Sequence, residues 1–249
     1  DIYEKWPHHK PREWRKYLRH FILMNIGDAL SLENQSERID SAYHKVQLSI
    51  REAIDDAYED ERIDEETPVV LMAQSLGAFI LSNYIWDVQR HETAAAHSVA
   101  PRRGRAMQAT DSAQMKRRYS LKNTRLLITT ACNIPLFITG NSKLLAIETQ
   151  KLGYDIEWMN YFYGEDVFGW PMQPMGEFYD PDAPLGQSYA TATTDVRVSP
   201  DSDSIAGWFL NKTPLCHVHY WKDDDLLDTF SARVHQRIYG ELRASVDES

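Results

Sequence analysis

An apolar run that leads through a serine into a helical pattern constrains this chain more than any other stretch. Residues 69 to 72 (Val-Val-Leu-Met) have the apolar, partly β-branched character of a strand buried on both faces. Beyond Gly77 the spacing becomes helical, with Phe79, Ile80, Ile85 and Trp86 on one broad face. Between the two lies Ala73-Gln74-Ser75-Leu76-Gly77. The stretch therefore predicts a strand, a tight turn with Ser75 at its tip, and a helix.

Such a turn suits a nucleophilic serine. A serine hydroxyl is a weak nucleophile until a base takes its proton, so it must stand clear of the sheet where a base can reach it. The turn also places backbone N–H groups at a helix N-terminus, where they can stabilise an oxyanion. The small residues Ala73 and Gly77 flank Ser75 and let the strand and the helix approach closely. A surface serine at an ordinary strand-to-helix turn would give the same five residues, so this motif alone leaves both interpretations open.

The stretch resembles the nucleophile elbow of the α/β-hydrolase superfamily, lipases and esterases included. The usual pattern is Gly-x-Ser-x-Gly, and Ala73 stands in place of the first glycine. The resemblance covers roughly residues 67 to 245. It implies an α/β fold with a mostly parallel central sheet flanked by helices, in a single domain over residues 1–249.

The same resemblance implies three catalytic residues in the chain order serine, acid, histidine. Ser75 is the expected nucleophile. Asp166 is the expected acid, because it follows an aromatic, strand-like segment in a turn. His217 is the expected base, because it lies just before Tyr220-Trp221 and a predicted C-terminal helix. The N–H of Leu76, the residue after the nucleophile, is one expected oxyanion-hole donor.

Several other residues compete for these roles. His219 is an alternative base, and on a strand it would point to the same side as His217. Glu165 is the nearest alternative acid, whereas Asp180 and Asp182 follow no evident strand. Cys132 ends a predicted strand, but a buried structural thiol is favoured over a nucleophile. A metal site built from His217, His219 and Asp223 to Asp225 is the weaker interpretation, because acidic residues also favour a helix N-terminus.

The remaining elements follow from periodicity and composition. Two helices are expected within residues 11–60, the second with a stripe from Ile39 to Ala57. Residues 91–120 change to an Ala-rich and then basic composition, which predicts a flexible insertion or lid. Further expected elements are strands at 125–131 and 154–163, a short helix at 141–153, a β-hairpin near 189–198, and a C-terminal helix from Leu227 to Leu242.

One part of the superfamily pattern is missing. The chain has no His-Gly or Gly-Gly before Ser75, and this is the segment that usually supplies the second oxyanion donor. It also shows no convincing strand before Val69, so the expected fold is reduced at its N-terminus or the sequence is truncated there. The strand at Val69 would then lie at a sheet edge. Our hypothesis is that a second copy of the chain covers this edge, giving a homodimer.

Composition excludes several classes of function. The net charge of −10 argues against binding to nucleic acid or to an anionic membrane surface. No apolar run approaches the eighteen or more residues of a membrane span. Two cysteines, Cys132 and Cys216, make a disulfide framework improbable, which predicts reduced thiols and a cytoplasmic location.

The sequence thus predicts a serine hydrolase that cleaves a small-molecule carboxylic ester through an acyl-enzyme intermediate, with no metal or organic cofactor. The alternative from another class is a non-catalytic protein that keeps the hydrolase scaffold for binding. The missing oxyanion segment favours this alternative.

Overall fold

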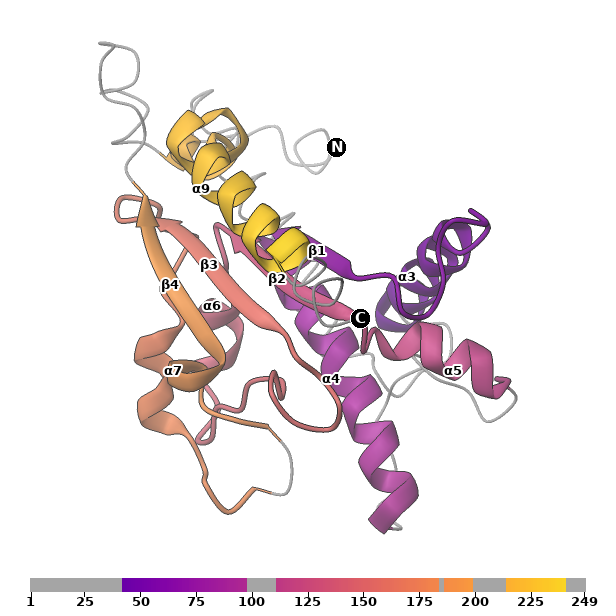
Figure 1. The fold of residues 1–249 in the computed structure, drawn as a ribbon. Coiled ribbons are helices and arrows are strands. Elements are labelled where there is room, and N and C mark those ends of the chain that lie inside the picture. Colours follow the sequence, from indigo (N-terminus) through magenta and orange to yellow (C-terminus); the bar gives the residue numbers. More distant parts are fainter. Residues whose placement is uncertain (1–41, 98–110, 184–185, 199–213, 241–249) are drawn as a thin grey trace, which may run out of the picture. The chain divides into compact units, whose positions relative to one another are not determined.

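The computed structural model describes residues 42–97, 111–183, 186–198 and 214–240, with the side chains of 92–97 and 214–215 excepted (Figure 1). The chain divides into two compact units, Asp1–Lys45 and Val46–Ser249. The single domain expected over residues 1–249 stays a prediction. Apart from Ala42–Lys45, every described residue belongs to the second unit. Within the described ranges, no helix is long and apolar enough to cross a membrane.

The second unit is built on a sheet of parallel strands, which confirms the expected α/β fold class. The strands lie in the order β1-β2-β3-β4, the same as their order in the chain. Their aromatic and β-branched residues suit a sheet that is covered on both sides. The strands are β1 (Val69–Gln74), β2 (Thr124–Thr130), β3 (Glu157–Tyr163) and β4 (Thr193–Val198).

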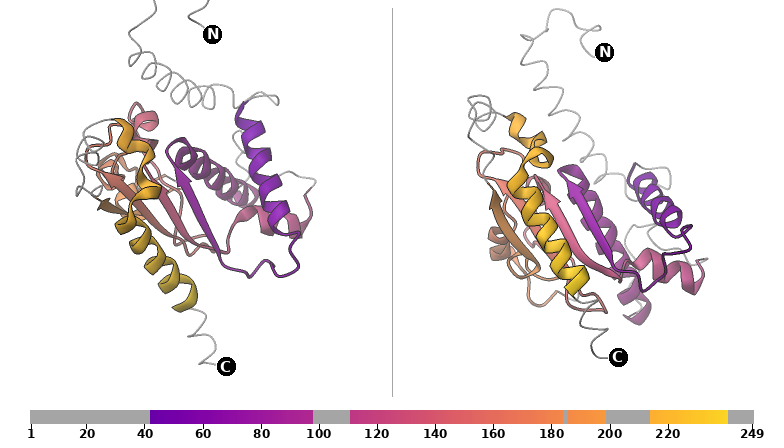
Figure 2. Two further views of the ribbon diagram at one scale, coloured as in Figure 1. Left: turned by 90° about the horizontal axis from the view of Figure 1, so that it is seen from above. Right: turned by 45° about the horizontal axis from the view of Figure 1, so that its top comes forward.

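Helices cover both faces of this sheet. The described helical segments are α3 (Ala42–Ala57), α4 (Leu76–His97), α5 (Ala113–Ser120), α6 (Ile134–Ile138), η2 (Gln173–Phe178), α7 (Tyr189–Ala192), η3 (Pro214–Val218), η4 (Tyr220–Lys222), α9 (Asp224–Val234) and η5 (His235–Tyr239). Figure 2 shows α9 over one face, with α4 and α7 on the other.

The alternation of side chains along each strand separates two hydrophobic cores. On β2, Leu127 joins the core beneath α4, whereas Leu126 and Ile128 join the core beneath α9. On β3, Trp158 and Tyr161 divide in the same way. All five side chains are almost completely buried. The two cores fix the sheet between its helices, so the loops at the strand ends start from a rigid support.

The expected sheet edge is present in the described part of the chain. There β1 is the first strand in the order and pairs with β2. The side chain of Met72 on β1 is 46% exposed. The homodimer that would cover this edge stays a prediction.

The predicted insertion at 91–120 contains more regular structure than its composition suggests. Helix α4 continues to His97, and α5 occupies Ala113–Ser120. The Ser112 side chain caps α5 by accepting a hydrogen bond from the N–H of Met115 at 3.1 Å. Residues 98–110 lie outside the described residues. The helix expected to carry the stripe from Ile39 to Ala57 is confirmed over α3, but the stripe is not its buried face. Ala53 and Ala57 are exposed, and the buried residues of α3 are His44, Gln47, Arg51 and Ile54. The helix expected before it lies outside the described residues.

The helix predicted at 141–153 is wrong. This segment is irregular because tertiary partners take hydrogen bonds that a helix would have formed. The side chain of Gln89 on α4 donates to the Glu148 carbonyl at 2.7 Å and accepts from the Glu148 N–H at 3.0 Å. Ala146 forms an isolated antiparallel bridge with Gln187. The segment therefore crosses the core without helical bonds.

The β-hairpin predicted near 189–198 is also wrong. Tyr189–Ala192 forms the short helix α7, capped by the Ser188 hydroxyl, which accepts from the N–H of Ala190 at 3.1 Å. Thr193–Val198 then runs parallel to β3, from Trp158 opposite Thr193 to Tyr163 opposite Val198. Thr193–Val198 pairs with β3 and needs no hairpin partner, and the residues before it form a helix instead.

Candidate active site

Three of the residues that meet at the candidate site closely follow strands of the sheet. Ser75 comes directly after β1, Asn133 closely after β2 and Asp166 closely after β3. His217 lies in η3, on the stretch that leads from β4 to α9. Since parallel strands share one carboxyl edge, Ser75, Asn133 and Asp166 start from the same edge of the sheet, where α/β proteins bind their ligands.

Ser75 stands at a sharp turn in left-handed backbone, with φ of 53°. Its N–H donates to the Thr130 carbonyl at the end of β2, at 3.0 Å. Its own carbonyl accepts from the N–H of Ala78 at 3.0 Å, so the turn joins directly to the first turn of α4. A left-handed serine is costly and persists only where surrounding contacts hold it. The turn places the Ser75 hydroxyl clear of the strand end, as the sequence predicts.

The flanking small residues are less tightly required than expected. A Cβ placed on Gly77 would lie 3.9 Å from the Cβ of Ala73, which is an ordinary contact. The backbone of Gly77 also has no positive φ. An alanine at this position would therefore fit, and the strand-to-helix approach here does not by itself demand glycine.

Ser75, His217 and Asp166 form a continuous hydrogen-bonded chain. The Ser75 Oγ lies 2.7 Å from His217 Nε2. The opposite ring nitrogen, Nδ1, lies 2.9 Å from Asp166 Oδ2 and 3.1 Å from Oδ1. A carboxylate only accepts, so we assign the imidazole proton to Nδ1. Nε2 is then free to accept the serine proton. His217 and Asp166 are almost completely buried, at 3% and 5% exposure.

Asp166 is held by more than the histidine. The Phe168 N–H donates to Oδ1 and the Tyr220 hydroxyl donates to Oδ2, each at 2.9 Å. Burial by itself would raise the pKa of the Asp166 carboxyl. The hydrogen bond and charge of His217, with the bonds from Phe168 and Tyr220, outweigh burial and hold the pKa below its usual value. The carboxylate is therefore ionised where it faces the imidazole.

Phe168 also contacts His217 directly. Its ring meets the His217 imidazole edge to face, with 5.5 Å between centroids and 71° between the planes. Val167 and Val218, the neighbours of the acid and the base in sequence, are both 55% exposed, and Trp170 is 42% exposed. Exposed apolar side chains thus lie close in sequence to the buried pair of Asp166 and His217.

Asn133 lies against the backbone of the nucleophile turn and was not predicted as a site residue. Its carboxamide is oriented so that two hydrogen bonds form: Nδ2 donates to the Ser75 carbonyl at 2.9 Å, and Oδ1 accepts from the Leu76 N–H at 3.2 Å. Asn133 is 3% exposed. The N–H of Leu76, expected to stabilise an oxyanion, therefore already has an acceptor. An asparagine after a strand is too common in turns for the sequence to identify it.

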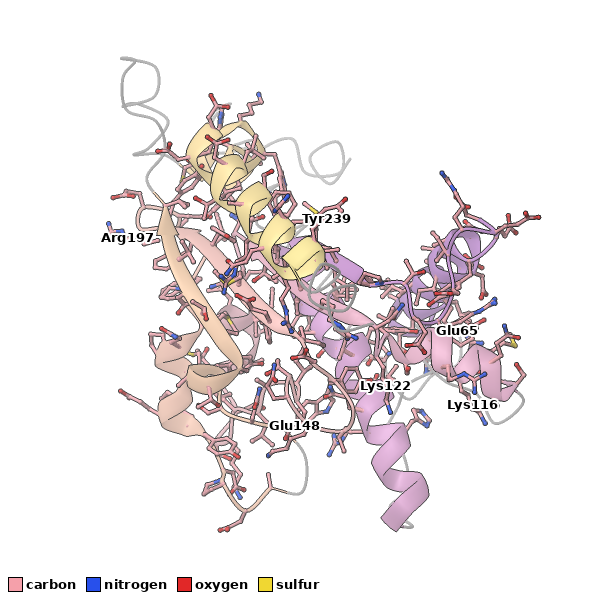
Figure 3. The ribbon with its side chains drawn as sticks, in the orientation of Figure 1. Glu65, Lys116, Lys122, Glu148, Arg197 and Tyr239 are labelled. Atoms are coloured by element: carbon pink, nitrogen blue, oxygen red, sulfur yellow. The ribbon has the colours of Figure 1, made fainter. Side chains whose placement is uncertain are left out.

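The alternative acids lie elsewhere. Glu165 is 3.7 Å from Arg197, which lies on β4 (Figure 3). Asp180 pairs with Lys143 at 2.5 Å, and its other carboxylate oxygen accepts from the N–H of Asp182. The structure therefore brings Asp166, and none of these three carboxylates, to the histidine.

The described side chains also give no support to His219 as the base or to the metal interpretation. His217 and His219 do not lie on a strand, where both side chains would point to one side: His217 lies in the 3₁₀-helix η3 and His219 caps η4. Asp223 is occupied as the cap of α9, accepting from the N–H of Leu226 at 2.9 Å and from the Tyr163 hydroxyl at 2.8 Å. Among the described side chains, no three His, Cys, Asp or Glu residues gather closely enough to hold a metal ion.

The two cysteines are buried thiols. Burial raises the pKa of Cys132 to about 12 and that of Cys216 to about 11. Cys132 also contacts the sulfur of Met172 at 3.6 Å inside the core. A thiol with so high a pKa carries little thiolate near neutral pH, so neither cysteine has the activated state that a nucleophile needs.

Comparisons with known proteins add no assignment to this geometry. No protein-family model matches the chain, and neither a curated protein nor a solved structure matches it.

Proposed function

We propose that this chain is a serine hydrolase of the α/β-hydrolase type that cleaves carboxylic esters through an acyl-enzyme intermediate. The observation that carries the proposal is the hydrogen-bonded chain from Ser75 Oγ through His217 to Asp166, with contacts of 2.7 and 2.9 Å. The three residues come in the chain order serine, acid, histidine, and Ser75 and Asp166 start from one edge of a parallel sheet.

The distances support a defined sequence of proton movements. Ser75 Oγ attacks the carbonyl carbon of the ester while its proton passes to His217 Nε2. The imidazolium then gives this proton to the leaving alkoxide as the carbon–oxygen bond breaks, which releases the alcohol and leaves an acyl-serine. Water repeats the same steps on the acyl group and frees the acid. Asp166, ionised and fixed by three donors, would stabilise the imidazolium at each stage.

The surroundings of the acid and the base favour an apolar substrate. Phe168 packs on the base, and Val167, Trp170 and Val218 expose apolar surface beside the acid and the base in sequence. An apolar acyl or alcohol group would gain roughly 25 cal/mol for each Å² that it removes from water there. Trp221, four residues after His217, donates its indole N–H to Gln74 Oε1 at 2.7 Å.

A non-catalytic scaffold is the second candidate, and one observation favours it. The Leu76 N–H faces Asn133 Oδ1, and the sequence has no His-Gly segment to supply a second donor. Catalysis would require the substrate oxygen to take the Leu76 N–H from the asparagine. Loss of a single oxyanion donor costs about 100- to 1,000-fold in kcat, so this competition decides whether the site turns over.

Two assays separate the candidates. In the first, the wild-type chain and Ser75→Ala are incubated with a fluorophosphonate probe, which labels a serine only when a base activates it. In the second, hydrolysis of a short-chain p-nitrophenyl ester is measured for both proteins. We expect labelling and turnover in the wild type and neither in Ser75→Ala. Folded wild-type protein that shows neither would reject the hydrolase and leave the binding scaffold.

A further inference from the structure

We propose that Gln74 is a positioning residue that sets the distance between the base His217 and the nucleophile Ser75. The inference rests on the proposed hydrolase function and extends it to a residue with no part in the proton transfers. Gln74 is the last residue of β1 and directly precedes Ser75. It therefore shares a backbone with the nucleophile while its side chain is available to other segments.

The Gln74 carboxamide joins β1 to the segment that carries the base. Its Nε2 donates to the His217 carbonyl oxygen at 2.9 Å. Its Oε1 accepts from the indole N–H of Trp221 at 2.7 Å. A carbonyl oxygen only accepts and an indole N–H only donates, so these two partners fix which end of the carboxamide faces each of them.

The alternation of β1 explains why Gln74 can reach this segment. Ala73 belongs to the core beneath α4, and Val70 packs against the core beneath α9. Side chains two or four residues apart on a strand share a face, so Gln74 points to the same side as Val70. Cys216, Tyr220 and Leu226 belong to the core on that side. The Gln74 carboxamide therefore lies on the face of the sheet that η3 and η4 cover, and it contacts both of these segments.

His217 needs such a tie because it is not on a strand. It lies in the short 3₁₀-helix η3, outside the sheet ladder that fixes Ser75 relative to β2. The backbone bond from the His219 N–H to the Cys216 carbonyl, at 3.0 Å, stays within the turn and sets no distance to β1. Gln74 supplies a bond between the backbone of the base and the strand of the nucleophile, 143 positions apart in sequence.

The consequence concerns the chemical step more than substrate binding. The proton passes between two atoms 2.7 Å apart. A shift of the base by about 1 Å can cost about 100-fold in rate. Removing the hydrogen bond is therefore expected to lower kcat, whereas KM should change little, because Gln74 is not among the apolar side chains proposed to meet the acyl or alcohol group.

The experiment uses a polar-to-apolar substitution of similar length, with a matched control. Gln74→Met removes both hydrogen bonds, and Trp221→Phe removes the indole donor and leaves the bond to His217. Gln89→Met is the control, because Gln89 also bridges two segments through its carboxamide but contacts Glu148, away from Ser75 and His217. For each folded variant we would measure kcat and KM on the p-nitrophenyl ester and the rate of fluorophosphonate labelling.

We expect Gln74→Met to lower kcat and the labelling rate roughly 10- to 100-fold, with KM within about twofold of the wild type. Trp221→Phe should have a smaller effect. The double variant should be no worse than Gln74→Met, because the indole acts through the carboxamide. Gln89→Met should lower the melting temperature and leave kcat unchanged. Wild-type kcat in Gln74→Met, or an equal loss of kcat in Gln89→Met, would overturn the proposal.

A second readout does not depend on catalysis. The proton between His217 Nδ1 and Asp166 can be followed by proton NMR as a strongly downfield signal, assigned by its loss in His217→Gln. Loss or exchange broadening of this signal in Gln74→Met, with retention in Gln89→Met, supports the positioning role even in a protein without turnover. An unchanged signal in Gln74→Met contradicts it. Failure of the hydrolase proposal and failure of the Gln74 proposal are thereby distinguished.

Discussion

The hydroxyl of Tyr220 joins the acid Asp166 to the backbone of β3. It donates to Asp166 Oδ2 at 2.9 Å and accepts from the Tyr163 N–H at 2.9 Å. The Tyr220 side chain is completely buried and stacks on the Tyr163 ring, with 4.1 Å between centroids. Burial, together with the nearby Asp166 carboxylate, raises the pKa of Tyr220, so the hydroxyl keeps the proton that it donates. The orientation of the Asp166 carboxylate thus depends on Tyr220, which lies three residues after His217.

Tyr220→Phe should weaken the site without unfolding it. The substitution keeps the stacked ring and removes one of the three donors to the carboxylate. Hydrogen bonds to charged groups contribute about 1.5–3 kcal/mol, and we expect part of this to appear as a fall in kcat of about tenfold. Steady-state hydrolysis of the p-nitrophenyl ester is the measurement.

Tyr163→Phe is the matched control for that variant. It also removes one buried hydroxyl from the stacked pair, but this hydroxyl donates to Asp223 at the cap of α9, at 2.8 Å. The backbone N–H that holds Tyr220 is unaffected. We therefore expect a loss of stability with kcat retained. Equal losses of kcat in both variants would mean that burial of the tyrosine pair, and not the bond to Asp166, governs the rate.

Asp166 should make stability depend on pH in the acid range. Its pKa is held below the usual value in the folded chain because the bonds from His217, Phe168 and Tyr220 outweigh burial. Such a carboxyl stabilises the fold at pH values above its unfolded pKa, which is about 4. The contribution is lost as the pH falls through the lower, folded pKa.

The test compares how the free energy of unfolding depends on pH in the wild type and in Asp166→Asn. Between about pH 5 and pH 2, the free energy of unfolding of the wild type should fall more steeply than that of Asp166→Asn. Urea denaturation at a series of pH values measures both. Parallel curves would show that Asp166 has the same pKa folded and unfolded, which would contradict the described network. Taking the difference between the two proteins removes the contribution of the other carboxyls.

Asn133→Asp tests the contact with the nucleophile turn. An aspartate has no donor for the Ser75 carbonyl, and it would place negative charge beside the Leu76 N–H, where an oxyanion would develop. We expect kcat to fall about 100-fold or more, comparable with the loss of an oxyanion donor. Fluorophosphonate labelling should slow in parallel, because the probe also develops negative charge at this position.

Asn123→Asp serves as the control for charge in a buried asparagine. Asn123 is also buried, and its Nδ2 donates to the Thr67 carbonyl at 2.6 Å, at the start of β1 and away from Ser75. This variant should lose stability and keep kcat. If Asn133→Asp retained wild-type kcat, Asn133 would not lie close to the position where the oxyanion develops.

Gly169→Ala should disturb the acid by crowding. A Cβ at this position would lie 2.5 Å from Asp166 Oδ2 and 2.9 Å from the Ala131 Cα. The second contact is with backbone, so relief requires movement of a strand end. Overpacking of this kind typically costs about 1–3 kcal/mol of unfolding free energy, and kcat should fall because the carboxylate shifts.

Gly140→Ala provides the comparison, because a Cβ there meets nothing within 4 Å. Its unfolding free energy should change by less than about 0.5 kcal/mol, and its kcat should not change. Denaturant melts and ester hydrolysis on the two variants provide the test. Equal behaviour of Gly169→Ala and Gly140→Ala would contradict the close packing around Asp166.

The sequence alone determined the elements whose signals are local. The run at 69–72 predicted β1, and the helical spacing after Gly77 predicted α4, because an apolar run and a 3.6-residue periodicity are properties of neighbouring residues. The order of Ser75, Asp166 and His217 along the chain was also readable, and the three side chains meet in one hydrogen-bonded chain. Their hydrolytic role stays a proposal.

Only the tertiary structure decided which residues support that chain. Gln74 and Trp221 are 147 positions apart, and Asp166 and Tyr220 are 54 apart, so no local pattern links them. The same reason explains the two wrong elements. Gln89 satisfies the backbone of Glu148 where a helix was expected, and β3 pairs with Thr193–Val198 where a hairpin was expected. Local preference amounts to tenths of a kcal/mol per residue, and distant hydrogen bonds and buried area outweigh it once the chain is folded.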